Sequence, residues 1–315
     1  GYDNFSAVIP SNYIRKLNNN INIPDVLSQL LSHRGYNEII SFTMLPKGSQ
    51  KLIHKDNEII KIVNPISEDK AELRASMITS MLQTYKYNQS RQTNSLRLYE
   101  SGKIYRYKNK KIIEKNIISG IIGGVNFNDN IKEFRKKLNF FDLKGDLSSL
   151  INNISFKKSS DSNYFDKNAQ MKIYQNTTLV GSLGTVSSNL REQYDLLDNV
   201  FYFELFLDSI TVDNDIKYTD FSIFPKIKRD ISLKLKNDTS IEDVMNCIRK
   251  SSLKYMINSR ISDIFYSKDA INSYKTVTIE LLFQHLSTTL SDKEVNEQML
   301  ILMNLLKTKL SIDIK

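Results

Sequence analysis

The last third of the chain carries a pattern of strands and helices that only a few folds accommodate. Residues 229–236 alternate apolar and polar side chains, with Ile231, Leu233 and Leu235 on one face, which predicts a half-buried strand. The same reasoning predicts the other elements of this third: a helix capped by Ser240, strands near 259–266 and 274–284, a helix that begins with a capping box at Ser291–Glu294, and a short strand in the last five residues. The order β-α-β-β-α-β is typical of a ferredoxin-like domain.

The preceding part of the chain predicts helices first and a mainly antiparallel sheet after them, which favours a separate α+β domain. We expect one helix over 25–34, a strand over 36–45, and a second helix, capped by Ser67, over 67–88. The sheet is expected from β-rich runs at 95–101, 103–107, 116–124, 171–174, 178–186 and 200–207, with a short helix near 147–152 that Asp146 would cap.

A polar segment between 208 and 220 separates these two parts. We therefore expect a connector over 1–24, a core domain over 25–208, a linker over 209–221 and a C-terminal domain over 222–315. The chain begins with Gly1 rather than Met, and its first residues look like the middle of a protein, so we expect an upstream region to be missing. A natural short form, a split gene product and a truncated record all stay open as explanations. It has no signal-peptide pattern and no apolar run near the length of about eighteen residues that spans a bilayer, which predicts a soluble, cytoplasmic protein.

The position of the positive charge along the chain indicates a nucleic-acid partner, whereas the total net charge does not. The chain has 44 Lys and Arg against 35 Asp and Glu, a net charge of +9, but it is also rich in Asn, Lys and Ile, as the codon bias of an AT-rich genome produces. Residues 221–315 hold 15 of the basic and 11 of the acidic residues, about twice the net charge density of the rest. Because clustered positive charge attracts phosphate, an RNA contact is expected in this region.

No motif in the sequence predicts a complete active site within this chain. A single Cys excludes a disulfide framework and a multi-thiolate metal site, and the P-loop motif is missing. Asp142 and Asp146 offer two carboxylates, but helix capping explains Asp146 better than acid–base work does. The remaining candidates have structural explanations: isolated histidines at His33, His54 and His285, a core thiol at Cys247, and glycines of a strand edge or turn at Gly120, Gly123 and Gly124.

Nine short words in the chain, in this order, resemble the β subunit of bacterial phenylalanyl-tRNA synthetase. They are Gly1-Tyr-Asp-Asn, Gly35-Tyr-Asn-Glu-Ile-Ile-Ser-Phe42, Asn64-Pro-Ile-Ser67, Leu73-Arg-Ala-Ser76, Tyr87-Asn88 with Arg91-Gln92, Arg97-Leu-Tyr-Glu-Ser-Gly102, Phe140-Phe-Asp-Leu-Lys-Gly-Asp146, Phe224-Pro-Lys-Ile-Lys-Arg-Asp230 and Thr289-Leu-Ser-Asp-Lys-Glu-Val-Asn296. The resemblance implies a non-catalytic core with the antiparallel sheet of class II aminoacyl-tRNA synthetases, followed by a ferredoxin-fold anticodon-binding domain.

The resemblance also implies where the chemistry occurs. In this family the α subunit adenylates phenylalanine, and the β core has lost catalysis. The sequence agrees, because the late segment Gly181–Arg191 lacks the spacing of the class II motif whose arginine holds ATP. Arg97 and Glu100 resemble a degenerate form of the second class II motif, and we interpret them as structural residues. Ser187-Ser188 stands where the family usually has His-Pro.

Cofactors and partners follow from the resemblance in the same way. The family's editing domain and the acidic magnesium ligands lie upstream of the matched region, so we expect no catalytic residue, metal site or cofactor in this chain, while the whole enzyme uses ATP and Mg²⁺. The expected partners are the α subunit, in an α2β2 heterotetramer, and tRNA(Phe).

The expected RNA contacts are basic residues near the start of the C-terminal domain. Lys228, Lys234 and Lys236 share one face of the predicted strand over 229–236, while Arg229 shares the opposite face with Ile231, which makes the three lysines the better candidates. The full candidate set is Lys226, Lys228, Arg229, Lys234, Lys236, Arg249, Lys250 and Lys254.

Two other functions stay open at this point. The chain could be a free-standing RNA-binding or assembly protein derived from such a subunit, and an independent adenylating enzyme is disfavoured by the missing arginine.

Overall fold

The chain folds into two compact units, Gly1–Asn214 and Asp215–Lys315, in a computed structural model. The structure describes residues 2–4, 22–109, 111–126, 136–212, 218, 220–237, 239–266, 274–310 and 313–314. Most of the connector expected over 1–24, and about half of the linker expected over 209–221, lie outside the described residues. Each unit has its own hydrophobic core and is described by itself.

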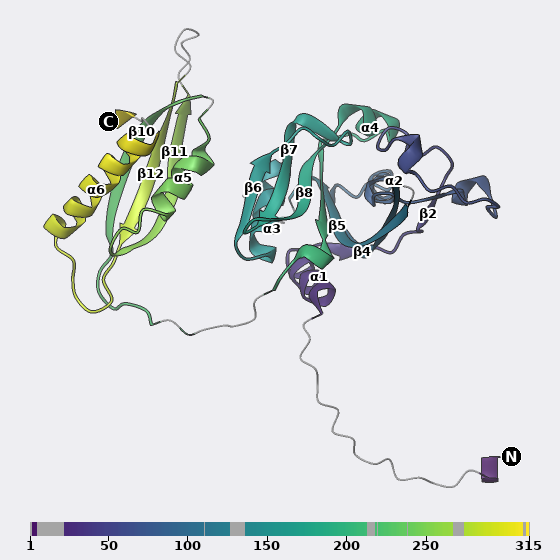
Figure 1. The fold of residues 1–315 in the computed structure, drawn as a ribbon, viewed down its shortest axis with the longest axis horizontal. Coiled ribbons are helices and arrows are strands. Elements are labelled where there is room, and N and C mark those ends of the chain that lie inside the picture. Colours follow the sequence, from purple (N-terminus) through teal and green to yellow (C-terminus); the bar gives the residue numbers. More distant parts are fainter. Residues whose placement is uncertain are drawn as a thin grey trace. The chain divides into compact units, whose positions relative to one another are not determined.

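A seven-stranded sheet in the order β1-β4-β5-β9-β8-β7-β6 forms the centre of the first unit (Figure 1). Its strands are β1 Asn37–Glu38, β4 Ser95–Lys108, β5 Lys111–Gly124, β6 Ile154–Lys158, β7 Phe165–Gln175, β8 Thr178–Val186 and β9 Val200–Phe206. β1 runs parallel to β4, and the other neighbours pair antiparallel. A separate two-stranded sheet pairs β2 Met44–Leu45 with β3 Glu72–Leu73.

Helices cover both faces of the large sheet. They are α1 Ile23–His33, α2 Ile78–Gln89, α3 Phe140–Leu150 and α4 Ser188–Gln193, with single 3-10 turns at η1 Tyr2–Asn4, η2 Asp56–Glu58, η3 Glu68–Lys70 and η4 Leu207–Ser209. Ile118 and Ile122 of β5 belong to the core under α1 and α3, whereas Ile117 and Ile121 belong to the core under α2. Both faces of the second half of β5, residues 117–123, are therefore buried, which explains the apolar sequence of that half.

The helix expected from Ser67 is wrong in its first half. Residues 68–73 form η3 and β3, and α2 begins only at Ile78. The chain stays non-helical here because Arg74 and Ser76 reach carboxylates on two different strands, and Ser76 Oγ then accepts a hydrogen bond from Ile78 N at 3.2 Å. Tertiary contacts override a good local capping sequence at this point.

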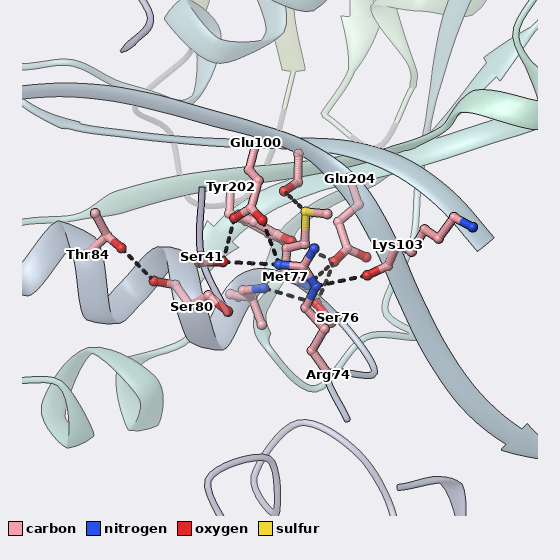
Figure 2. A network of polar contacts seen from close by, with 12 residues as sticks. Ser41, Arg74, Ser76, Met77, Ser80, Thr84, Glu100, Lys103, Tyr202 and Glu204 are labelled. Atoms are coloured by element: carbon pink, nitrogen blue, oxygen red, sulfur yellow. Dashed lines mark hydrogen bonds and ion pairs between the residues drawn. The ribbon is translucent and has the colours of Figure 1, made fainter. Parts of the chain in front are cut away.

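Figure 2 shows the polar network that these residues build inside the first unit. Arg74 Nη1 donates to Glu100 Oε1 at 2.6 Å, and both side chains are 4% exposed. Arg74 Nε also donates to the carbonyl of Lys103 at 2.8 Å. On the next-but-one strand, Glu204 Oε1 accepts from Ser76 Oγ at 2.5 Å, Met77 N at 3.0 Å and Tyr202 OH at 2.6 Å. Every buried carboxylate of the network is thus held by donors, as burial of a charge requires.

Asp146 does not cap a helix, contrary to the sequence-based prediction. α3 begins at Phe140, and Asn139 and Asp142 form its capping box. Asp146 lies buried in the second half of the helix, where it accepts from Tyr36 OH at 2.9 Å and pairs with Arg97. It therefore ties α3 to the end of α1 and to β4.

Several other boundaries differ from the predicted ones. The strand expected over 36–45 is reduced to the short strands β1 and β2. The two strands expected over 95–101 and 103–107 form the single strand β4, and β6 was not predicted. Gly120 and Gly123 lie within β5 and pair with strands on both sides, rather than at an edge or turn, whereas Gly124 ends the strand with a φ of 85°. They are required because a Cβ at these positions would overlap the Phe203 ring, Tyr85 Oη and the carbonyl oxygen of Asn94, respectively.

The second unit is the predicted β-α-β-β-α-β domain. Its antiparallel sheet has the order β11-β12-β10-β13, and α5 and α6 pack on one face (Figure 1). The elements are β10 Ile227–Lys236, α5 Ile241–Arg249, β11 Met256–Tyr266, β12 Tyr274–Phe283, α6 Asp292–Leu310 and β13 Asp313–Ile314. Glu294 Oε2 accepts from the backbone N and Oγ of Ser291, which confirms the capping box, and Cys247 is half-buried beside the core.

Replacing Gly120 by Ala is expected to destabilise the first unit by about 1–3 kcal/mol, because the added methyl group meets the Phe203 ring and the Leu98 carbonyl oxygen at 2.9 Å. Gly145→Ala is the matched control. Gly145 lies in α3, and no atom lies within 4 Å of the place that its added methyl group would occupy, so helix propensity should stabilise the unit by about 1 kcal/mol. Urea unfolding followed by circular dichroism measures both, and a neutral Gly120→Ala contradicts the close packing.

Replacing Arg74 by Met is expected to cost about 3–5 kcal/mol of unfolding free energy, because the Glu100 carboxylate then stays buried without its cation. Lys86→Met removes an ion pair with Asp195 at the surface of the same unit and should cost less than about 1 kcal/mol. The same unfolding experiment compares the two. Equal losses of unfolding free energy in the two variants would contradict the stronger effect expected for the buried Arg74–Glu100 pair.

Candidate nucleic-acid interface

The sheet of the second unit has one face packed under α5 and α6 and one face open to solvent. Ile231, Leu233 and Leu235 of β10 point into the core and are buried, so the alternate residues of the strand occupy the open face. Those residues are Lys228, Asp230, Ser232, Lys234 and Lys236. The strand register places them beside Leu282, Glu280, Thr278, Thr276 and Tyr274 of β12.

The structure brings together only three of the eight candidate RNA contacts. Lys228, Lys234 and Lys236 are exposed on the open face, as the alternation predicts. Arg229 lies on the helix side of the sheet, where it pairs with Asp292 at the start of α6. The others lie off the strand: Lys226 just before β10, Arg249 and Lys250 at the C-terminal end of α5, and Lys254 in the segment that follows.

At one end of the open face, two acidic residues, Glu280 and Asp230, balance the charges of Arg260 and Lys228. Glu280 of β12 stands between Arg260 of β11 and Asp230 of β10 in the register. Arg260 grips its carboxylate at two points, Nε to Oε1 at 2.7 Å and Nη2 to Oε2 at 3.0 Å, and Lys228 pairs with the same carboxylate. Hydrogen bonds from Arg260 and Lys228 lower the pKa of Glu280 to about 2, so it stays ionised at neutral pH.

The other end of the open face combines cations with aromatic rings. Lys234 Nζ lies 4.7 Å from the centroid of the Tyr274 ring, and Lys236 stands opposite Tyr274 in the register. Phe265 of β11, opposite Thr276, is 63% exposed. Ammonium groups and aromatic rings on one open surface suit a single-stranded nucleic acid, since phosphates contact the cations and bases stack on the rings.

Sequence reasoning missed Arg260, Tyr274 and Phe265. Tyr274 could have been found by extending the alternation of β10 to its partner strand, because all open-face residues of β12 follow the same period of two. Arg260 and Phe265 were hidden by two irregularities in the register of β11, between Met256 and Asn258 and between Ile261 and Asp263.

The charged residues that the sequence analysis singled out in the first unit are bonded within the unit. Arg97 pairs with Asp146, and Glu100 pairs with Arg74, so both residues of the candidate second motif hold the fold together. Arg191, the last residue of the late glycine-containing segment, donates to Asn199 Oδ1 at 2.6 Å. Within the described residues there is no cluster of three or more side chains that could hold a metal ion.

The three histidines lie apart and do not form a site. His33 ends α1 at the surface, and His285 Nδ1 accepts hydrogen bonds from the backbone of Ser287 and Thr288 at 3.1 and 3.2 Å. His54 is buried, and burial together with the charge of Arg106 lowers its pKa to about 3. None of the helices in the described part of the chain is long and apolar enough to cross a membrane.

Two family models match the chain and together cover most of it. The model described as the phenylalanyl tRNA synthetase beta chain CLM domain matches residues 8–207, and the ferredoxin-fold anticodon binding domain matches residues 222–315.

Curated relatives agree with these matches. The chain is 33% identical over 286 residues to the phenylalanine–tRNA ligase beta subunit of Wigglesworthia glossinidia brevipalpis, with 88% of this chain and 36% of the relative covered. It is 30% identical to the subunit of Blochmanniella floridana, with the same shares covered, and 27% identical to that of Colwellia psychrerythraea, with 100% of this chain and 40% of the relative covered. The chain thus spans well under half the length of these relatives.

A solved structure of a pyrrolysyl tRNA synthetase from Desulfitobacterium hafniense aligns at a TM-score of 0.46 and 13% identity, covering 59% of this chain and 65% of the other. The assignment rests on the sequence matches, which confirm the resemblance found in the nine words and the two-part α+β architecture. The chain belongs to the family of phenylalanyl-tRNA synthetase β subunits.

Proposed function

We propose that this chain is the non-catalytic C-terminal part of a phenylalanine–tRNA ligase β subunit, which supports the α subunit and binds tRNA(Phe) during ATP-dependent charging with phenylalanine. The observation that carries the proposal is the match of residues 222–315 to an anticodon-binding family, together with an open sheet face that presents Lys228, Lys234 and Lys236. The α2β2 assembly and the cytoplasmic location belong to the same proposal.

The internal ion pairs of the first unit support the non-catalytic part of the proposal. Acyl and phosphoryl transfer need a fixed cation that faces the developing negative charge. Arg97 and Arg74 are instead committed to the carboxylates of Asp146 and Glu100. On this proposal the chain holds no cofactor, and ATP and Mg²⁺ are bound elsewhere in the holoenzyme.

The open face of the second unit would meet the tRNA through its aromatic and cationic end. Lys234 and Lys236 would contact phosphates, and Tyr274 would offer a ring to an unpaired base. Lys228 contributes less, because its charge and that of Arg260 are balanced by Glu280 and Asp230.

Co-purification tests the role as a subunit. We expect the chain, within its full-length protein, to bind an α-type partner, and the complex to show phenylalanine-dependent pyrophosphate exchange that neither component shows alone. Tight tRNA binding without any such partner would contradict the subunit role and favour the free-standing RNA-binding protein.

Replacing Lys234 and Lys236 by Ala is expected to weaken tRNA binding and to lower the slope of log K against log salt by about 1 to 2. Filter binding of tRNA between low and moderate salt measures the slope. Lys307→Ala with Lys309→Ala is the control, because it removes the same charge from the last turn of α6, which packs on the other face of the sheet.

Glu280→Gln should act in the opposite direction to the lysine variants. It frees Arg260 and Lys228 from their shared carboxylate, so tRNA affinity and the salt slope should both rise. An unchanged salt slope in all three variants would locate the RNA contacts away from the open face.

A further inference from the structure

The first unit contains a cavity whose charged lining none of the roles above uses. It has a volume of about 210 Å³ and lies on the outer half of the β4–β5 hairpin. Three basic residues line it, Arg106 and Lys108 of β4 and Lys115 of β5. Ile104 and Phe206 contribute apolar surface, and Glu58 of η2 is the acidic residue of the lining.

The strand register explains why three cations gather here. Ile104, Arg106 and Lys108 alternate along β4 and therefore share one face of the sheet. Lys115 stands directly opposite Ile104 on β5, which makes it the diagonal neighbour of Arg106. Like charges so placed on adjacent strands repel each other, and this arrangement is destabilising unless an anion joins them.

Protein groups fix part of this lining without neutralising it. Arg106 Nε donates to the carbonyl of Ala75 at 2.8 Å, and Lys115 Nζ lies 4.8 Å from the centroid of the Phe206 ring. Within the described residues, no carboxylate lies within 4 Å of the charged nitrogens of Arg106, Lys108 or Lys115. Arg106 and Lys115 are thus held in position, and none of the three cations forms an ion pair with a carboxylate in the described part of the chain.

The lining of the cavity has fewer negative charges than positive ones. Glu58 Oε2 lies 3.7 Å from Nδ1 of His54. His54 is neutral at physiological pH, because burial and the neighbouring Arg106 lower its pKa to about 3. The lining therefore carries a net formal charge of +2 at neutral pH.

We propose that this cavity binds a phosphate group. Guanidinium and ammonium donors on one wall match the several acceptor oxygens and the multiple negative charge of a phosphate. The apolar surface of Ile104 and Phe206 leaves room for the less polar part of a phosphate-bearing molecule. The phosphate could come from a free phosphate compound or from an RNA backbone, and both sources have the same recognition chemistry.

The test uses the chain as it is, with inorganic pyrophosphate as the free probe and a twelve-nucleotide single-stranded RNA as the second probe. The double variant Lys108→Gln and Lys115→Gln should weaken the binding of pyrophosphate, of RNA or of both by at least about tenfold in titration calorimetry at low salt. Glu58→Gln should tighten the same binding a few-fold, because it removes the acidic wall. Circular dichroism confirms that the variants fold.

The matched control removes two lysines from another strand of the same sheet. The double variant Lys157→Gln and Lys158→Gln, at the exposed end of β6, should leave binding of the affected probe unchanged. A loss confined to pyrophosphate identifies a free phosphate compound as the ligand, and a loss of RNA binding identifies the backbone; both support the site. The proposal is overturned if neither probe binds, or if the double variant binds both as tightly as the parent chain. Variants of Lys234 and Lys236 test the open face separately, so the two proposals fail independently.

Discussion

Burial of the large sheet on both faces is the constraint on which the rest of the first unit depends. With helices on each side, any carboxylate on a central strand must find its donors inside the protein. Glu204 on β9 takes three donors, two of them from Ser76 and Met77 just before α2, and Glu100 on β4 takes Arg74. The segment between β3 and α2 is therefore shaped by an acidic residue more than a hundred positions later as well as by its own propensity.

The second unit differs from the first, because only one face of its sheet is buried and the other is exposed to solvent. Strands β10 and β12 alternate apolar and polar residues. Their apolar residues pack under α5 and α6 without a buried ion pair, among the described residues, of the kind that holds Arg74. This difference explains why one domain presents a broad polar surface to solvent, while the other keeps most of its charged motif residues inside.

This difference also decided what the sequence could predict. All six elements of the second unit follow from periodicity and from the Ser291–Glu294 capping box, because an alternating strand and an amphipathic helix leave local signals. In the first unit, β5 and α1 were found, but the start of α2, the role of Asp146 and the strand β6 were not. These depend on partners distant in sequence, such as Tyr36 and Arg97 for Asp146. On the open face, the lysines of β10 follow from alternation, whereas Arg260 depends on a register that irregular pairing conceals.

The arrangement around Glu280 makes the electrostatic potential of the open face differ between its two ends. One end carries cations that are compensated within a few ångströms, while the other end, at Lys234 and Lys236, keeps its field. The potential along the strands is therefore a gradient, and a gradient exerts torque on an approaching polyanion before any contact forms. An elongated, negatively charged molecule would arrive already turned toward one end of the sheet, so that the geometry of first encounter is set at long range.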